Sequence, residues 1–299
     1  MKLTVHVSGI GLLGPGLASW AAARAALGGL AVREPGVDDP TPWQPAPTAV
    51  PAPQRLPATE RRRAGTVVRA SIVVADEALA AAGLDAGALP TVFTSSTGDP
   101  LNCHLLCEAL AAPARLVSPT RFTNSVHNAP AGYWHIAAQS RAPSTSLAAF
   151  DASFAAGLLE AAVQCASSQA AVLLVACDVP YPEPLHAVRP VADVMAVALV
   201  LAPQAGAAGS RRIVIEAASE NAAESAADSA ADSAADRADG RAGGRAATPC
   251  HPAALDALRH TIPAARALPL LQALAGAAAA STMIEGLPGQ FLHVQVDAA

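Results

Sequence analysis

The stretch "SLAAFDASFAAGLLEA", residues 146–161, decides how the fold is read. A run typical of a strand, Ser146 to Phe150, meets a tight corner, and a helical pattern opens near Ala152. A strand that turns sharply into a helix has the architecture of a nucleophile elbow. The free N–H groups and the dipole of the helix favour an anion at this corner. The corner residue is Asp151, and a carboxylate is a poor nucleophile for acyl transfer.

The composition excludes several classes of protein. The 299 residues are 52% hydrophobic and 14% charged, whereas globular domains usually have about 25% charged residues. So little charged surface favours a partner that buries one face of the chain. With a net charge of −5 and no basic stripe interleaved with aromatic residues, nucleic-acid binding is not expected. Neither a signal peptide nor a membrane span is predicted, so we expect a cytoplasmic protein.

The cysteines and glycines predict no metal and no cofactor. The 5 cysteines lack the spacing of a disulfide framework, which fits a reducing cytoplasm. Cys103 and Cys107 lie four residues apart on a predicted helix, and without a second ligand cluster this pair is more typical of a core face. Gly9 and Gly11 make half of a dinucleotide-binding fingerprint, but the third glycine is missing.

The pattern of elements predicts an α/β fold. Two continuous apolar runs, residues 170–178 and 193–203, are typical of strands buried on both faces. Together with strands at both ends of the chain and helices between them, they indicate a mixed sheet with helices on both faces. The predicted helices cover residues 17–27, a segment from an N-cap at Thr59 to Gly83, a segment that starts at Pro100, a segment around Ala129, the elbow helix to about Ser167, and one or two helices within 251–283.

A low-complexity segment divides the chain. "SAADSAADSAAD", residues 225–236, is a tandem repeat of small and charged residues that cannot bury enough surface to offset the entropy of ordering. We therefore expect a domain over residues 1–216, a flexible linker over 217–247, and C-terminal helices and a terminal strand over 248–299 that complete the domain.

Two blocks carry a resemblance to a known family. "VSGIGLLGPG" with "SWAAARAALGG", and "RFTNSVHNAPAGYWHIAAQSRAPSTSLAAFDASFAAGLLEA", resemble β-ketoacyl synthases of the thiolase-like superfamily. In that family a V-x-N-x-x-A-G helix precedes a G-P turn, a strand at the dimer edge and a cysteine elbow. Val126, Asn128, Ala131 and Gly132 match the helix motif. The resemblance covers about residues 1–216 and implies a thiolase-like fold truncated to roughly the N-terminal half.

The departures from the family concern its catalytic residues. Counted from Pro143, the position of the family's catalytic cysteine is Asp151. The two histidine loops of the family have no counterpart, because His251 and His260 lack their glycine-rich contexts. Decarboxylation of a malonyl extender would then lack its electrostatic stabiliser. We therefore expect no catalytic residue and no enzyme activity, with Asp151 capping its own helix.

The resemblance implies a partner. A synthase homologue without its cysteine resembles a chain length factor, here of the β-ketoacyl synthase-like N-terminal domain proteins found in aryl-polyene and polyketide-type ketosynthase pairs. It implies a heterodimer with a catalytic β-ketoacyl synthase, whose acyl tunnel this chain shapes in fatty acid or polyketide-type synthesis, and contact with an acyl carrier protein through the complex. The family dimer uses the strand before the elbow and the preceding helix, so the expected interface residues are Asn128, Tyr133, Trp134, Thr145, Leu147 and Phe150.

Two other functions stay open at this point. One is a decarboxylase or acyltransferase that depends on acyl carrier protein and uses Asp151 with Ser153 or a nearby histidine. The other is a stand-alone acyl-binding scaffold. For His127 and His135 the simpler interpretation is packing or a loop hydrogen bond. Arg61 to Arg63 form either a solvated first turn of a helix or a docking patch for an acidic partner.

Overall fold

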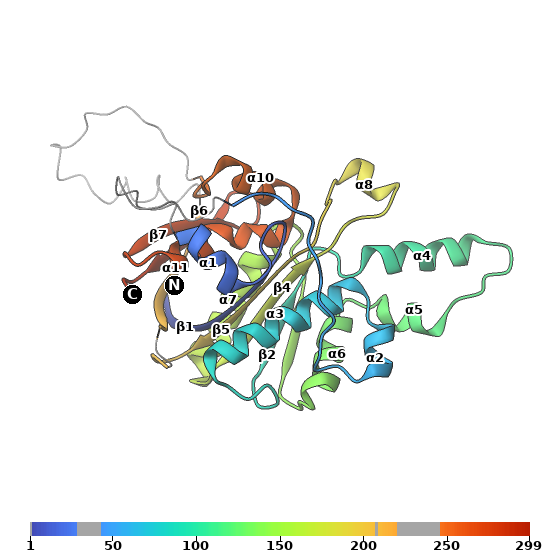
Figure 1. Cartoon of the computed structure of the whole chain (residues 1–299), viewed down its shortest axis with the longest axis horizontal. Coiled ribbons are helices and arrows are strands. Elements are labelled where there is room, and N and C mark those ends of the chain that lie inside the picture. The colour runs from blue at the N-terminus through green and yellow to red at the C-terminus, as the bar shows by residue number, and fades with distance from the viewer. Residues whose placement is uncertain (1, 29–42, 207–208, 220–245) are drawn as a thin grey trace.

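A computed structural model describes residues 2–28, 43–206, 209–219 and 246–299. Its centre is an eight-stranded sheet in the order β3-β2-β4-β5-β1-β6-β8-β7 (Figure 1). Most of the expected linker falls outside these residues. The strands are β1 (Lys2–Leu13), β2 (Thr91–Thr94), β3 (Ser144–Leu147), β4 (Val172–Asp178), β5 (Met195–Ala202), β6 (Arg211–Ser219), β7 (Ala280–Glu285) and β8 (Gln290–Val296).

The sheet is mixed, as the sequence predicts. β2 runs parallel to both β3 and β4, and the other neighbouring strands pair antiparallel. β3 is one edge of the sheet and β7 is the other. The two apolar runs become β4 and β5 at the centre, where nearly every residue is buried.

Helices cover both faces of the sheet (Figure 1). Because successive side chains of a strand point to opposite faces, Leu173 and Val175 of β4 join one core with α3 and α6, while Leu174 joins another with α7, α11 and α1. The helices are α1 (Trp20–Gly28), α2 (Ala58–Arg63), α3 (Thr66–Ala82), α4 (Pro100–Ala111), α5 (Pro119–Asn124), α6 (Ala129–Ala138), α7 (Ser153–Ser168), α8 (Leu185–Val188), α10 (Ala253–Thr261), the 3₁₀ helix η1 (Pro263–Ala267) and α11 (Leu268–Ala275).

The C-terminal segment adds to the same sheet. β8 pairs with β6 and buries Leu292, Val294 and Val296, the face that the alternating sequence predicts. The expectation that residues 280–283 are helical is wrong, because α11 ends at Ala275 and the chain returns as β7. The turn at residues 286–289 allows this hairpin, and Gly289 adopts a φ of 73° there.

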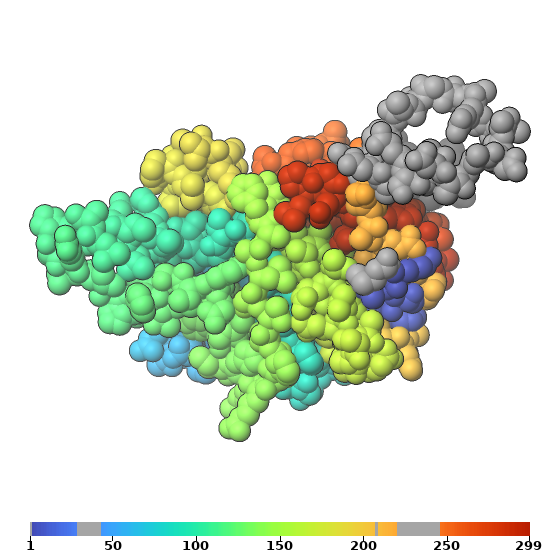
Figure 2. Space-filling model, turned by 180° about the vertical axis from the view of Figure 1, so that it is seen from behind, coloured from blue at the N-terminus to red at the C-terminus, as the bar shows by residue number. Residues whose placement is uncertain are grey.

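Two further expectations need correction. The helix predicted from Thr59 to Gly83 is two helices, since Ala64 is extended between α2 and α3, and Thr59 is not the N-cap. Gly83 does end α3, in the left-handed conformation. Cys103 and Cys107 do not face a core; both are exposed on α4, which reaches out from the body together with α5 (Figure 2).

The glycines of β1 serve close packing. A Cβ at Gly11 would lie 1.9 Å from the carbonyl oxygen of Val74, and one at Gly9 would lie 2.0 Å from that of Ala78. Both carbonyls belong to α3. Gly9 and Gly11, which match half of a dinucleotide-binding fingerprint, therefore serve to let β1 pack closely against α3.

We predict that Gly11→Ala destabilises the protein by about 3 kcal/mol or more, because the new methyl group overlaps backbone atoms that cannot move alone. Gly132→Ala is the matched control, since a Cβ there meets no atom within 4 Å. It lies within α6, so alanine should raise stability by up to about 1 kcal/mol. Urea unfolding of both variants measures the difference, and equal effects would contradict the close packing of β1 on α3.

Candidate functional site

The elbow between β3 and α7 is fixed by Ser153. Its Oγ donates to the carbonyl oxygen of Phe150 at 2.7 Å and accepts from the N–H of Ala149 at 3.0 Å. Phe150 has a φ of 52°, in the left-handed region that residues other than glycine rarely adopt. These two hydrogen bonds hold that conformation, and Ser153 is the first residue of α7.

Asp151 does not cap its helix, contrary to the sequence-based expectation. No side chain caps α7. The Asp151 carboxylate instead pairs with Nη2 of Arg189 through Oδ1, and its Oδ2 lies 3.7 Å from Nη2 of Arg266. Arg189 also stacks on the Phe150 ring, with its Cζ 3.8 Å from the ring centroid. A helix cap satisfies only local N–H groups, whereas two guanidinium groups supply charge-assisted partners.

The ion pairs continue beyond Asp151. Nε of Arg266 lies 3.1 Å from Oε2 of Glu285, and Nη1 of Arg259 lies 3.4 Å from Oε1 of the same glutamate. Arg259 also bonds Asp256 at 2.7 Å, and this hydrogen bond holds the pKa of Asp256 below its ordinary value. We call this set the elbow ion-pair cluster: Asp151, Arg189, Arg259, Arg266, Asp256 and Glu285. It has three cations and three anions, so its formal charge is balanced.

A cavity of about 300 Å³ opens beside the elbow. It is lined by Phe150, Asp151, Arg266, Glu285 and the turn between β7 and β8. Asp151 borders this cavity, and each of its two carboxylate oxygens lies near a guanidinium group. The negative charge of the carboxylate is therefore balanced by arginine. This arrangement suits a structural anchor better than a free nucleophile.

Four cysteines of the described residues have a raised pKa, which makes them unfavourable substitutes for the nucleophile. Burial raises the pKa of Cys165 to about 11 and that of Cys250 to about 12. Burial also raises the pKa of Cys177 and of Cys103. Since the thiolate is the reactive form, these thiols are weak nucleophiles near neutral pH.

The buried Asp178 holds in place the 3₁₀ helix that carries Arg266 of the elbow ion-pair cluster. It ends β4 and is 2% exposed. Its Oδ1 accepts from the N–H of Ser96 at 2.8 Å, from Oγ of Ser96 at 2.6 Å and from Oγ of Ser95 at 3.3 Å. A backbone hydrogen bond from Ala264 reaches the same carboxyl group. Asp178 thereby ties the ends of β2 and β4 to η1, which carries Arg266.

The expected interface residues divide into exposed and buried ones. Asn128 and Phe150 are exposed, and Thr145 and Leu147 are partly buried on β3. Tyr133 and Trp134 are buried within the chain itself, so the expectation that either anchors a partner is wrong. The Tyr133 hydroxyl donates to Oδ1 of Asn124, and Trp134 packs in the core under α3.

Sequence reasoning missed other exposed apolar side chains. Ile136 of α6 is 51% exposed and Val126, just before that helix, is 47% exposed. The signal was available, because two residues along an α-helix turn by about 200°, so Ile136 faces away from the buried Trp134. Of the two histidines, His135 forms a loop contact, with Nδ1 2.9 Å from the carbonyl oxygen of Ser140.

The comparisons with known proteins define the class. The family model of the β-ketoacyl synthase N-terminal domain matches residues 38–243, more than half of the chain, and the chain belongs to this family. Among curated proteins, no match is found. Among the described residues, none group as three or more potential metal ligands, and no helix is long and apolar enough to cross a membrane.

Solved structures share the thiolase-like ketosynthase fold. A ketosynthase (ApeO) in complex with its chain length factor (ApeC) from Xenorhabdus doucetiae matches with a TM-score of 0.64 and 22% identity, over 98% of this chain and 99% of that one. The ishigamide ketosynthase/chain length factor matches at 0.62 and 16%, over 99% of each chain. A type II ketosynthase with its acyl-carrier protein (AntDE:AntF) matches at 0.67 and 13%, over 100% of each.

We predict that Asp178→Asn keeps the fold and gains stability relative to the wild type as pH rises. Burial raises the pKa of Asp178, so the folded state favours the protonated acid. The resulting stability is complete below the ordinary Asp pKa of about 4 and is lost as pH rises through the raised folded pKa. Asparagine retains an acceptor oxygen for Ser96 and does not ionise.

The measurement is urea unfolding of both proteins at several pH values from about 4 to 7. Asp178→Ala serves as the comparison, because it leaves the buried N–H of Ser96 unpaired at a cost of about 1–3 kcal/mol. A stability gap between wild type and Asp178→Asn that does not change with pH would contradict this interpretation.

Proposed function

We propose that this chain is a non-catalytic subunit that pairs with a catalytic β-ketoacyl synthase and shapes the acyl tunnel of that partner, as a chain length factor does. The observation that carries the proposal is Asp151 at the elbow, held by Arg189 and Arg266. A carboxylate engaged by two guanidinium groups has little freedom to attack a thioester. The same pairing argues against the alternative of a decarboxylase or acyltransferase that uses Asp151.

The open edge of the sheet supports a protein partner. β3 is an edge strand, and within the described residues no strand pairs with its outer side. Unprotected edges invite pairing with another chain. Several large exposed apolar residues lie between α4 and the elbow: Leu101, Leu110, Leu116, Phe122, Val126, Ile136 and Phe150. Exposed apolar surface of this kind is typical of interaction sites.

The solved relatives suggest the nature of that partner. Two of them are complexes of a ketosynthase with a chain length factor, and a third contains an acyl-carrier protein. By analogy, we infer that this chain forms a heterodimer with a ketosynthase in the cytoplasm and meets acyl carrier protein through that complex. We further propose that this complex acts in aryl-polyene or related polyketide-type synthesis.

Backbone geometry identifies the residue that tests the interface. The N–H of Thr91 donates to the carbonyl oxygen of Pro143, and the N–H of Ser95 donates to that of Leu147. Backbone groups of successive strand residues alternate in direction, so the odd-numbered residues of β3 face β2 and the N–H of Ser146 faces the open edge. Proline is tolerated where the N–H it removes faces solvent.

We predict that Ser146→Pro folds normally but fails to co-purify with a co-expressed β-ketoacyl synthase that is encoded in the same genome as this chain. Ser146→Ala is the matched control, because it keeps the N–H and should co-purify as the wild type does. Elongation assays should find product with the wild-type pair and none with this chain alone. Co-purification of Ser146→Pro at the wild-type level would overturn the interface, and elongation by the isolated chain would overturn the non-catalytic role.

A further inference from the structure

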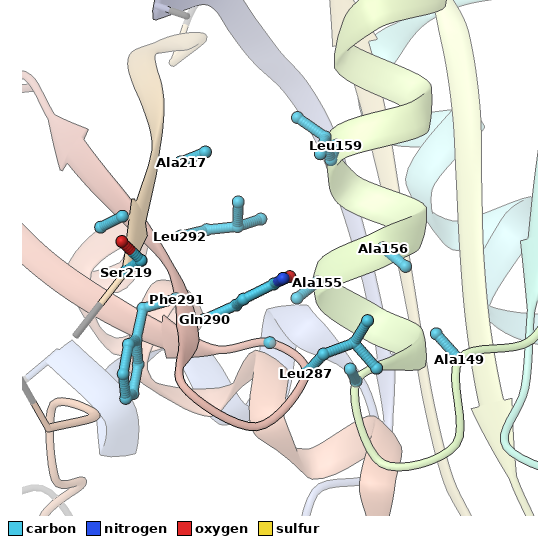
Figure 3. A pocket seen from close by; sticks show the side chains of 13 residues that line it. Ala149, Ala155, Ala156, Leu159, Ala217, Ser219, Leu287, Gln290, Phe291 and Leu292 are labelled. Carbon is cyan, nitrogen blue, oxygen red and sulfur yellow. The ribbon is translucent and has the colours of Figure 1, made fainter. Parts of the chain in front are cut away.

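A small cavity of about 80 Å³ is lined by all three arginines of the elbow ion-pair cluster. Its walls come from the elbow, the loop after α8, the end of α10 and the 3₁₀ helix η1. The ionisable residues of the lining are Asp151, Arg189, Arg259, His260 and Arg266. The larger cavity along α7 differs in character, because alanine and leucine side chains such as Leu159 and Leu292 line much of it (Figure 3). We call the small cavity the arginine cavity.

The charges that line the arginine cavity do not balance one another. With His260 counted as neutral, three arginines and the single carboxylate of Asp151 give the lining a formal charge of +2. Asp256 and Glu285, the other two carboxylates of the cluster, do not line this cavity. Coulomb energy falls with distance, and charges in a partly buried site are weakly screened, so the nearest groups dominate. The arginine cavity therefore favours an anion.

The hydrogen bonding of Arg266 also points to a ligand. Its Nε atom is buried and has no hydrogen-bond partner among the described residues, although it lies 3.1 Å from Oε2 of Glu285. That Oε2 atom is likewise buried without a hydrogen bond, so the two charges are close but poorly aligned. Buried polar atoms normally have a partner, and an exception calls for an explanation such as a water molecule or an ion. An oxyanion in the cavity would supply acceptors for this guanidinium group.

The size and the rigidity of the arginine cavity suit a compact oxyanion. A cavity of this volume can hold a few water molecules or one small ion. The guanidinium groups are held in advance, since Arg189 is paired with Asp151 and the side chain of Arg259, paired with Asp256, is only 5% exposed. Binding therefore orders few additional side chains. Guanidinium groups match the geometry of phosphate oxygens with paired N–H donors.

We propose that the arginine cavity is a binding site for a phosphate dianion, held by the guanidinium groups of Arg189, Arg259 and Arg266. Asp151 is the carboxylate of the lining, and its charge opposes the anion and limits the affinity. A bound phosphate would join the loop after α8 to the C-terminal segment, in parallel with Asp151 itself. The site lies within this chain and does not depend on a partner synthase.

The test is isothermal titration of the isolated full-length chain with inorganic phosphate, at an ionic strength kept constant with sodium chloride. We expect saturable binding that weakens at least about tenfold in Arg266→Gln. Asp151→Asn removes the opposing charge and should bind phosphate more tightly than the wild type, by about threefold or more. This gain keeps the test valid if Arg266→Gln does not fold. Arg212→Gln is the matched control, because it removes an arginine from an exposed ion pair with Asp297 outside the cavity, and it should bind as the wild type does.

A second arm separates the two sources of a phosphate dianion by titrating glycerol 3-phosphate. Binding equal to that of inorganic phosphate would assign the site to phosphate monoesters, and binding of inorganic phosphate alone would assign it to the free ion. Absence of saturable binding up to about 10 mM phosphate would overturn the site. Weaker binding by Asp151→Asn, or an equal loss in Arg212→Gln, would overturn the assignment to the arginine cavity. Because the titration contains no synthase, its result is independent of the proposed function.

Discussion

The pairing of the Asp151 carboxylate with Arg189 and Arg266 is the constraint on which this structure depends. It joins three parts of the chain that lie far apart in sequence: the elbow, the loop after α8 and the 3₁₀ helix of the C-terminal segment. Partly buried ion pairs give little net stability unless their geometry is satisfied. Here Glu285, Arg259 and Asp256 extend the pairing, and Asp178 fixes the helix that carries Arg266. The elbow is thus held as a junction between segments.

A junction of this kind changes what the elbow can do. In a nucleophile elbow the corner side chain must be free to meet a substrate, whereas Asp151 is engaged on both oxygens. The surface beside the elbow is then more important for function than the corner side chain. The open edge of β3 lies directly before the elbow.

Much of the fold could be predicted from the sequence, because local patterns carry it. The buried runs of β4 and β5, the alternation of β8 and the start of a helix just after Asp151 all follow from residue pattern, whereas the strand predicted over Ser146 to Phe150 is β3, which ends at Leu147. The partners of Asp151 could not be predicted, since Arg189 and Arg266 approach it only through tertiary structure. Local pattern failed where tertiary pairing decides the structure: residues 280–283, predicted to be helical, belong to β7, which pairs with β8.

The central claim, that Asp151 anchors the elbow and carries no acyl group, can be measured directly. The heterodimer would be incubated with an acyl donor on its carrier protein, and both chains would then be digested and analysed by mass spectrometry. The account predicts an acyl adduct on the partner synthase and none on the peptide that contains Asp151. An acyl adduct on Asp151 itself would contradict it.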